Sequence, residues 1–391
     1  MDENKQKIIE NFYNEALFTF NSLSCDCVVE HEYIRPGVVQ ESFKVASISN
    51  KKIRFAFEPQ KGLVRLSSRG TIEEKNILGN LLQIPGDSLE NFKDFFNQNG
   101  FLFPTKIDEY EKISCENFYI IMTRLCAVIE LLDLVSNPKE KNYLEILNRI
   151  LYLLFSKRAS IKYENVDYES CEHEFSKILF SNDVFHSTLS SIEAFDTGKY
   201  SIQDTIYGVY KLNVADYSSI ICQNPPPPLG FHDSTLIRLT DMYANCHNCS
   251  KKVRKIIDFL FHYCYEVQPI NLGNGIPYCE PKEENFTQEL KDALISITKI
   301  IIKEEIDHNI KGVVPVYDEE KLEPKWHVTT LLSAIYFSLF YLRPDLQIYK
   351  RCENPRCNKL FLVNRTSTNR RYCDDYCRGR LNQVKYRAKQ K

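Results

Sequence analysis

Four cysteines in the last forty residues of the chain have the spacing of a metal site. Cys352 and Cys357 form one pair with four residues between them, and Cys373 and Cys377 form a second pair with three. Fifteen residues separate the pairs. Two tight thiolate pairs joined by a short spacer supply the four ligands of a tetrahedral zinc ion. Four sulfurs leave no open coordination position, so the pattern predicts one structural Zn²⁺ rather than a catalytic metal.

The residues around these cysteines predict a small finger over 349–391. Asn354-Pro355 favours a turn inside the first pair. The apolar run 360–363 predicts a strand, 370–372 its returning partner, and a helix is expected to begin at Cys373. This order of knuckle, hairpin and helix is treble-clef-like. Two disulfides or four free structural thiols are the alternatives to a metal.

The same segment resembles the CGNR zinc-finger family, which occurs at the C-terminus of bacterial proteins predicted to regulate transcription. The tetrad here reads Cys-Arg-Gly-Arg over 377–380, so the family's Gly-Asn is absent, and the last cysteine pair is one residue closer than usual. The resemblance implies a DNA-binding regulator, with DNA favoured over RNA, and an upstream region similar to the ABATE domain. The matching residues are Cys352, Cys357, Phe361, Arg370, Arg371, Tyr372, Cys373, Cys377, Arg380, Lys385, Arg387 and Lys389.

Charge is distributed unevenly along the chain. The whole sequence carries a net charge of −2, but residues 350–391 contain 13 Lys/Arg against 3 Asp/Glu. The tail is therefore +10 and the preceding body −12. A basic tail on an acidic body predicts a polyanion partner, here nucleic acid. A solvated tail, or one that docks on the acidic body, is the alternative. The expected phosphate contacts are Arg370, Arg371, Arg378, Arg380, Lys385, Arg387 and Lys389.

The expected compartment is the cytoplasm, without membrane contact. The first residues are charged and carry no secretory signal, and the most apolar run, 331–342, is too short to span a bilayer. In a reducing compartment most of the 14 cysteines should stay reduced. Those scattered singly among apolar residues are expected to be small buried hydrophobes: Cys115, Cys126, Cys171, Cys222 and Cys264.

The periodicity of apolar residues predicts an α+β, mostly helical protein of three parts. These are an α+β domain over 1–222 that senses a signal or forms homo-oligomers, a helical region over 223–348 after the proline run 225–228, and the finger over 349–391. The first domain is expected to contain an N-terminal helix and a small antiparallel sheet. Strands are expected near 27–34, 38–46, 52–57 and 63–67, and helices near 1–22, 116–135, 141–156, 250–265, 285–305 and 327–342.

Other constellations are weaker. Cys246 and Cys249, with Cys264 and Cys279, are the candidates for a second zinc site, although no second tight pair is present. The chain contains no phosphate-binding glycine loop, nucleophile elbow or H-E-x-x-H motif, so no enzymatic activity is predicted. A protein-interaction adaptor, or a nucleic-acid-processing enzyme targeted by its finger, remains the alternative. The best candidates for a cryptic site are His232 with Asp233, and His327 beside Trp326.

Overall fold

The computed structural model divides the chain into two compact units. Unit 1 consists of Met1–Ser136, Arg158–Ser170 and Glu305–Lys391, and unit 2 of Asn137–Lys157 and Cys171–Glu304. The structure describes residues 16–58, 62–74, 76–84, 88–136, 141–163, 166–180, 201–211, 238–239, 242–243, 246, 249–319, 322–342, 347–354, 357, 360–364, 370–373 and 376–380.

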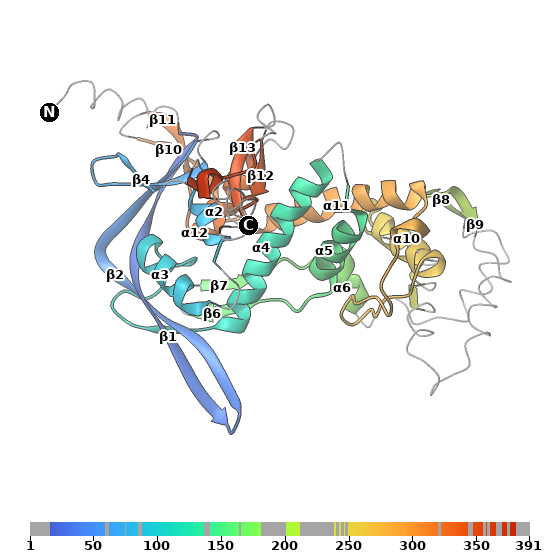
Figure 1. The fold of residues 1–391 in the computed structure, drawn as a ribbon, viewed down its shortest axis with the longest axis horizontal. Coiled ribbons are helices and arrows are strands. Elements are labelled where there is room, and N and C mark those ends of the chain that lie inside the picture. Colours follow the sequence, from blue (N-terminus) through green and yellow to red (C-terminus); the bar gives the residue numbers. More distant parts are fainter. Residues whose placement is uncertain are drawn as a thin grey trace, which may run out of the picture. The chain divides into compact units, whose positions relative to one another are not determined.

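The described elements give a mixed α+β protein (Figure 1). Unit 1 contains β1 (Phe18–Arg35), β2 (Val38–Glu58), β3 (Gly62–Leu66), β4 (Ile72–Glu74), α2 (Ile77–Leu81), α3 (Leu89–Asn99), β5 (Glu111–Ser114), α4 (Cys115–Ser136), β6 (Ser160–Tyr163), β7 (Val166–Glu169), β10 (Val314–Asp318), β11 (Glu323–His327), α12 (Leu331–Phe340), β12 (Gln347–Arg351) and β13 (Leu360–Asn364). Unit 2 contains α5 (Tyr143–Phe155), α6 (Glu174–Phe180), β8 (Ser201–Thr205), β9 (Gly208–Lys211), α10 (Lys251–Glu266) and η2 (Glu283–Asn285). The remaining helix, α11 (Gln288–Asn309), gives its residues up to Glu304 to unit 2 and its last turn to unit 1.

An antiparallel sheet is the frame of unit 1. Its order is β1-β2-β3-β4, and β5 also pairs with β2. The long strand β2 pairs with β1 along its length, with β5 through Ser42–Val45 and with β3 through Arg54–Glu58. Both faces of β2 are covered at two places, because the consecutive residues Val45–Ser47 and Phe55–Glu58 are buried and neighbouring side chains of a strand point to opposite faces.

Aromatic side chains join this sheet to the helices that cover it. Phe43 of β2 makes edge contacts with Phe96 of α3 and Phe118 of α4, at ring-centroid distances of 5.7 and 5.3 Å. Phe92 of α3 also contacts Phe118, at 4.7 Å. All four rings are buried. Edge-to-face packing of this kind fixes the two helices on the sheet more specifically than burial alone.

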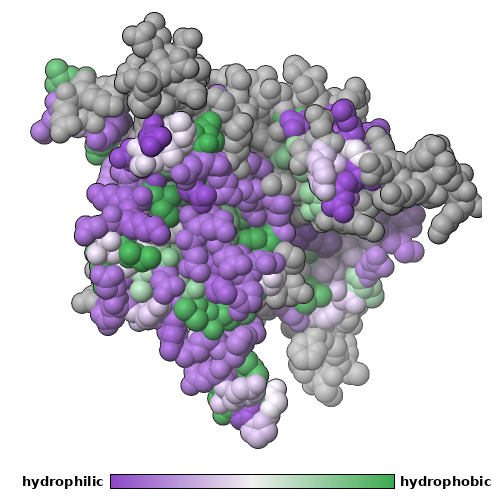
Figure 2. All heavy atoms as spheres, turned by 60° about the vertical axis from the view of Figure 1, so that its left-hand side comes forward, coloured by the Kyte–Doolittle hydropathy of each residue, from purple (hydrophilic) through white to green (hydrophobic). Residues whose placement is uncertain are grey.

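Helix α3 also protects the free edge of β1. The side-chain amide of Asn97 accepts a hydrogen bond from the Cys27 N–H at 2.7 Å and donates one to the Cys27 carbonyl at 3.2 Å. It therefore takes the place of a neighbouring strand at this residue. Beyond Glu30 and Ser42, where the pairing with β5 ends, β1 and β2 continue as a two-stranded ribbon, whose end is the projection at the bottom of Figure 2. Its exposed apolar side chains are Tyr33, Ile34, Val38 and Val39.

The core of unit 2 is helical. Helix α10 buries every residue from Ile256 to Cys264 together with Val253, and α5 buries the apolar face that begins at Ile146. Each helix starts at a side-chain cap, because Ser250 accepts a hydrogen bond from the Val253 N–H and Asn142 accepts one from the Glu145 N–H.

Several sequence expectations are tested by these elements. The sheet and the helices expected near 116–135, 141–156, 250–265, 285–305 and 327–342 are present with shifted ends. The N-terminal helix is wrong from Phe18 onward, because Phe18 and Phe20 alternate with exposed residues along β1, and residues 1–15 lie outside the described part. The expected domain limit at 222 lies outside it as well, and the predicted domain division stays a prediction.

Three of the scattered cysteines are buried, as expected. Cys115, Cys171 and Cys264 are buried, Cys126 is half-buried, and Cys222 lies outside the described residues. Burial raises the pKa of Cys115 and Cys264 to about 12, so both thiols are protonated at neutral pH. They act as apolar packing groups and not as nucleophiles.

Candidate metal centre

The first cysteine pair lies in the loop of a β-hairpin. Strands β12 and β13 pair antiparallel, from Gln347 opposite Asn364 to Arg351 opposite Leu360. The loop between them contains both cysteines, and the Cys357 N–H donates to the Asn354 carbonyl at 2.8 Å, which closes a tight turn. The partner of the apolar strand is therefore β12, and the returning strand expected at 370–372 is wrong, since those residues form no strand.

The second pair is tied to this loop by hydrogen bonds. The Glu353 N–H donates to the Arg371 carbonyl at 2.9 Å, and the Asn354 side-chain amide donates to the Cys377 carbonyl at 3.2 Å. Cys373 precedes a helical turn over 376–380. The apolar base beneath the cysteines is formed by Phe361 and Val363 of β13, both buried, with Tyr372 partly buried against them. The hairpin itself contacts α4 and α2 of the same unit.

The four sulfur atoms form one cluster. All of them lie within 4.8 Å of one another, and the Cys357–Cys373 and Cys373–Cys377 sulfur distances are both 3.6 Å. A tetrahedral zinc ion with Zn–S bonds of about 2.3 Å places its sulfurs about 3.8 Å apart. The observed spacing fits such an ion, and it is far too long for a disulfide. Cys352, Cys357, Cys373 and Cys377 are thus placed together as a group that can hold a metal ion.

Electrostatics in the cluster favour a bound cation. Burial opposes ionisation of Cys352, but hydrogen bonds from the backbone N–H groups of Cys373 and Asn354 lower the pKa of its thiol. Burial and the neighbouring sulfurs raise the pKa of Cys373, and they raise the pKa of Cys377 to about 12. Four sulfurs this close cannot all be thiolates without a positive ion between them. A metal would offset this repulsion and release the remaining protons.

Basic side chains surround the second pair. Arg370 is exposed, but its guanidinium donates to the Cys373 carbonyl at 2.6 Å and lies 5.3 Å from the Phe361 ring centroid. It therefore supports the fold of the loop and also adds positive charge beside the sulfurs. Arg371 lies 3.8 Å from the Glu353 carboxylate at the surface.

The helical turn carries further exposed charge. Arg378 and Arg380 are exposed, and the Arg380 guanidinium stacks 5.4 Å from the ring centroid of Tyr376, which is 69% exposed. An exposed aromatic ring beside arginines is a surface on which a nucleobase can stack. The other three predicted contacts, Lys385, Arg387 and Lys389, lie outside the described residues.

The weaker candidates do not assemble in the described part of the chain. The sulfurs of Cys246, Cys249, Cys264 and Cys279 do not form a group within 4.8 Å, so the second zinc site is not formed there. Cys246 is buried and donates to the Tyr243 carbonyl at 3.1 Å. His327 ends β11 with an exposed side chain, and His232 and Asp233 lie outside the described residues.

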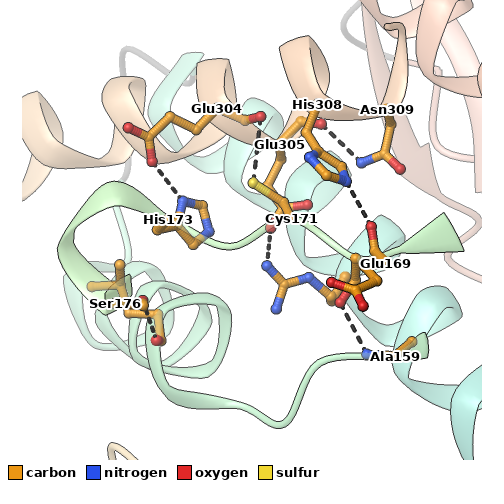
Figure 3. A network of polar contacts seen from close by, with 12 residues as sticks. Ala159, Glu169, Cys171, His173, Ser176, Glu304, Glu305, His308 and Asn309 are labelled. Carbon is orange, nitrogen blue, oxygen red and sulfur yellow. Dashed lines mark hydrogen bonds and ion pairs between the residues drawn. The ribbon is translucent and has the colours of Figure 1, made fainter. Parts of the chain in front are cut away.

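Sequence reasoning missed two polar networks, parts of which appear in Figure 3. In unit 1 the Arg124 guanidinium of α4 pairs with the Glu305 carboxylate of α11, and both side chains are only 1% exposed. In the same unit His308 Nε2 donates to the Glu169 carbonyl at 2.7 Å. In unit 2 His173 lies 2.7 Å from the Glu304 carboxylate. The one sequence signal was a charged residue in the middle of an apolar helix.

Comparisons with known proteins give no relative, since no family model, no curated protein and no solved structure matches this chain. None of the helices in the described residues is long and apolar enough to cross a membrane. The function of this chain is therefore inferred from its own residues.

Proposed function

We propose that the C-terminal module holds one structural Zn²⁺ and binds nucleic acid. The observation that carries this proposal is the cluster of four sulfurs whose second pair is flanked by exposed arginines. The metal would fix the loop containing Cys357 against the turn that follows Cys373. This fixed geometry would present Arg371, Arg378 and Arg380 on one small surface, where they would contact phosphates.

The arrangement supports a backbone-directed mode of binding. Guanidinium groups bind phosphate oxygens through paired N–H donors, and each neutralised phosphate releases a counterion. Tyr376 adds a face for stacking with an unpaired base. The resemblance to the CGNR family favours DNA and a role in regulating transcription, and the expected setting is the cytoplasm. Sequence selectivity would require contacts to base edges in addition to these phosphate contacts.

The test is binding of the full-length protein to mixed duplex DNA and to single-stranded RNA across a salt series, with metal content measured alongside. The expected result is one zinc per chain and an affinity that falls steeply with salt. For each phosphate neutralised on duplex DNA, the slope of log Kobs against log salt should become more negative by about 0.9. The variant Arg378→Glu, Arg380→Glu should lose at least tenfold in affinity and keep its zinc.

A matched charge reversal separates local from general electrostatics. Lys51→Glu, Lys52→Glu changes two exposed lysines on β2 by the same total charge and should leave binding within twofold. Equal losses in both double variants would mean that net charge alone drives association. Zinc present with no binding at low salt would refute the nucleic-acid proposal and leave a protein-interaction module in its place.

A further inference from the structure

Helix α10 of unit 2 begins with an unusual concentration of positive charge. Four of its first five residues are cationic, and its first turn contains no acidic residue. The N-terminus of a helix carries a partial positive charge, which favours acidic side chains there and disfavours cations. This helix therefore gives up an ordinary source of stability at its start. An anion from outside the chain would offset the unfavourable charge.

Helix α11 runs antiparallel beside α10. Near the end of α10, the Tyr263 ring packs 5.7 Å from the ring of Phe286, which lies just before α11. Near the start of α10, the Lys255 ammonium group donates to the Ser296 hydroxyl of α11 at 3.4 Å. The contact positions move backward along α10 as they move forward along α11, so the N-terminus of α10 lies beside the second half of α11.

Both helices place lysines on this shared side. Residues three or four apart occupy one face of a helix, so the lysines at the start of α10 lie on the face of Lys255. On α11 the residue one turn beyond Ser296 on the same face is also a lysine. These residues come together at the N-terminal end of the helix pair. We call them the lysine row, and its members are Lys251, Lys252, Lys255 and Lys299.

The lysine row is not neutralised within the described part of the chain. Three of its members are exposed and Lys255 is half-buried. None of the four forms an ion pair with a described residue. The adjoining turns contribute no carboxylate, because α10 has no acidic residue over 251–257 and α11 has none over 293–303. Like charges on neighbouring turns repel one another, and a polyanion would relieve this repulsion.

The surroundings of the lysine row favour nucleic acid over a lipid surface. Basic helices that bind membranes also insert apolar side chains into the lipid. In the described part of unit 2 the exposed large apolar side chains belong to Phe180, Tyr207, Tyr265 and Ile276. None of them lies on α11 or on the first turns of α10, and Tyr265 stands at the opposite end of α10. Ammonium groups without apolar neighbours are suited to phosphates that stay in water.

We propose that the lysine row is a second nucleic-acid contact of this chain, which binds backbone phosphates without reading base sequence. Each ammonium group that neutralises a phosphate would release a counterion, and this release favours binding at low salt. The contact belongs to unit 2, so it extends the function proposed for the metal centre and does not require it.

The test is fluorescence anisotropy of labelled duplex DNA of mixed sequence with the full-length protein across a salt series. Lys252→Glu and Lys299→Glu change one residue of each helix, and each alone should weaken binding at least threefold at low salt. Together they should weaken it at least tenfold and make the slope of log Kobs against log salt less negative by about 1.8, since each lost phosphate contact accounts for about 0.9. The zinc content should be unchanged.

The matched control is Lys282→Glu, an exposed lysine of unit 2 that precedes η2 and lies 3.9 Å from the Glu284 carboxylate. It changes the net charge by the same amount as Lys252→Glu and should bind within twofold of the wild type. Equal losses in these two variants would mean that net charge alone drives association, and the proposal would be rejected.

A stability measurement separates binding from folding. Lys252→Glu places an acidic residue in the first turn of α10, where the helix dipole favours it. The urea midpoint of this variant, followed by circular dichroism, should therefore equal or exceed that of the wild type. A lower midpoint would give Lys252 a structural role and overturn the proposal.

A second background separates this contact from the metal centre. The Lys252→Glu, Lys299→Glu changes should weaken DNA binding in the Arg378→Glu, Arg380→Glu protein as well. If they have no effect in either background, the lysine row is not a nucleic-acid contact. If they weaken binding while Arg378→Glu, Arg380→Glu does not, the proposal for the metal centre fails and this one stands. Binding to phosphatidylserine vesicles that depends on the row, with unchanged DNA binding, would assign it to a membrane and reject nucleic acid.

Discussion

Replacing Glu305 by Gln removes the negative charge that faces the Arg124 guanidinium inside unit 1. Both side chains are 1% exposed, and Arg124 lies in the apolar middle of α4 between buried Ile121 and Leu125. Water cannot solvate the guanidinium there. We therefore expect Glu305→Gln to destabilise unit 1 far more than the loss of an ordinary surface pair would.

The magnitude follows from the burial. Removing one partner of a buried ion pair costs about 3–5 kcal/mol, whereas an exposed pair contributes about 0.2–1 kcal/mol. With a urea dependence of about 2–3 kcal/mol per molar, the expected shift of the unfolding midpoint is about 1–2.5 M. Replacing both residues, as Arg124→Met with Glu305→Leu, should recover most of the loss, because an apolar pair needs no desolvation of charge.

The assay uses the one tryptophan of the chain. Trp326 belongs to unit 1 and packs 5.0 Å from the Phe337 ring, so its fluorescence during urea unfolding reports this unit. The control pair is Arg158 with Glu169, also in unit 1, whose side chains are 43% and 44% exposed at 3.5 Å. A double-mutant cycle on each pair gives its coupling energy. A coupling below about 1 kcal/mol for Arg124 with Glu305 would refute the reasoning.

Three further changes test other parts of the structure. Cys357→Ser should abolish stoichiometric zinc, measured by atomic emission, and the control Cys279→Ser, at an exposed cysteine, should retain it. Gly100→Ala should destabilise unit 1 by more than about 1 kcal/mol in urea. The reason is that Gly100 has φ +79° and that a Cβ there would lie 2.5 Å from the Leu23 carbonyl oxygen. An unchanged unfolding midpoint would contradict this close approach of the two backbone segments. Asp258→Asn should stabilise the protein by about 1–3 kcal/mol at pH 7.5 and not at pH 4, as followed by circular dichroism. Burial raises the pKa of Asp258 from 3.8 to about 6, so the free-energy cost of its buried charge appears only as the pH rises above the unfolded pKa. Equal effects at both pH values would exclude this origin.

The spacing of the cysteines and the periodicity of the apolar residues predicted part of this structure. The four thiols and the helices with continuous apolar faces could be located from sequence, because ligand spacing and helical periodicity are short-range properties. The helix expected up to residue 22 was wrong because Phe18 and Phe20 belong to a two-residue alternation that the preceding helical spacing obscured. Periodicity also could not identify β12 as the partner of β13, since strand pairing depends on the turn between them.

The polar sites could not be located in this way. Arg124 and Glu305 are 181 residues apart, and nothing in the sequence around either residue indicates the other. The hydrogen bond from the Ile206 N–H to the Asp258 carboxylate likewise joins segments 52 residues apart. Such sites are products of tertiary packing, so a single sequence contains no spacing that predicts them.

The order in which the segments of unit 1 occur has a consequence for biosynthesis. A ribosome adds about 5–20 residues per second, so Arg124 would emerge about 10–40 s before Glu305. During that interval the sheet and α4 exist without α12, the β12–β13 hairpin and the last turn of α11, whereas the segments of unit 2 are complete once residue 304 has been made. Unit 1 therefore cannot reach its final fold cotranslationally before the whole of unit 2 has been synthesised. We expect chaperones to be needed, and truncated products to aggregate, while the nascent chain contains the β1–β4 sheet without its later partners in unit 1.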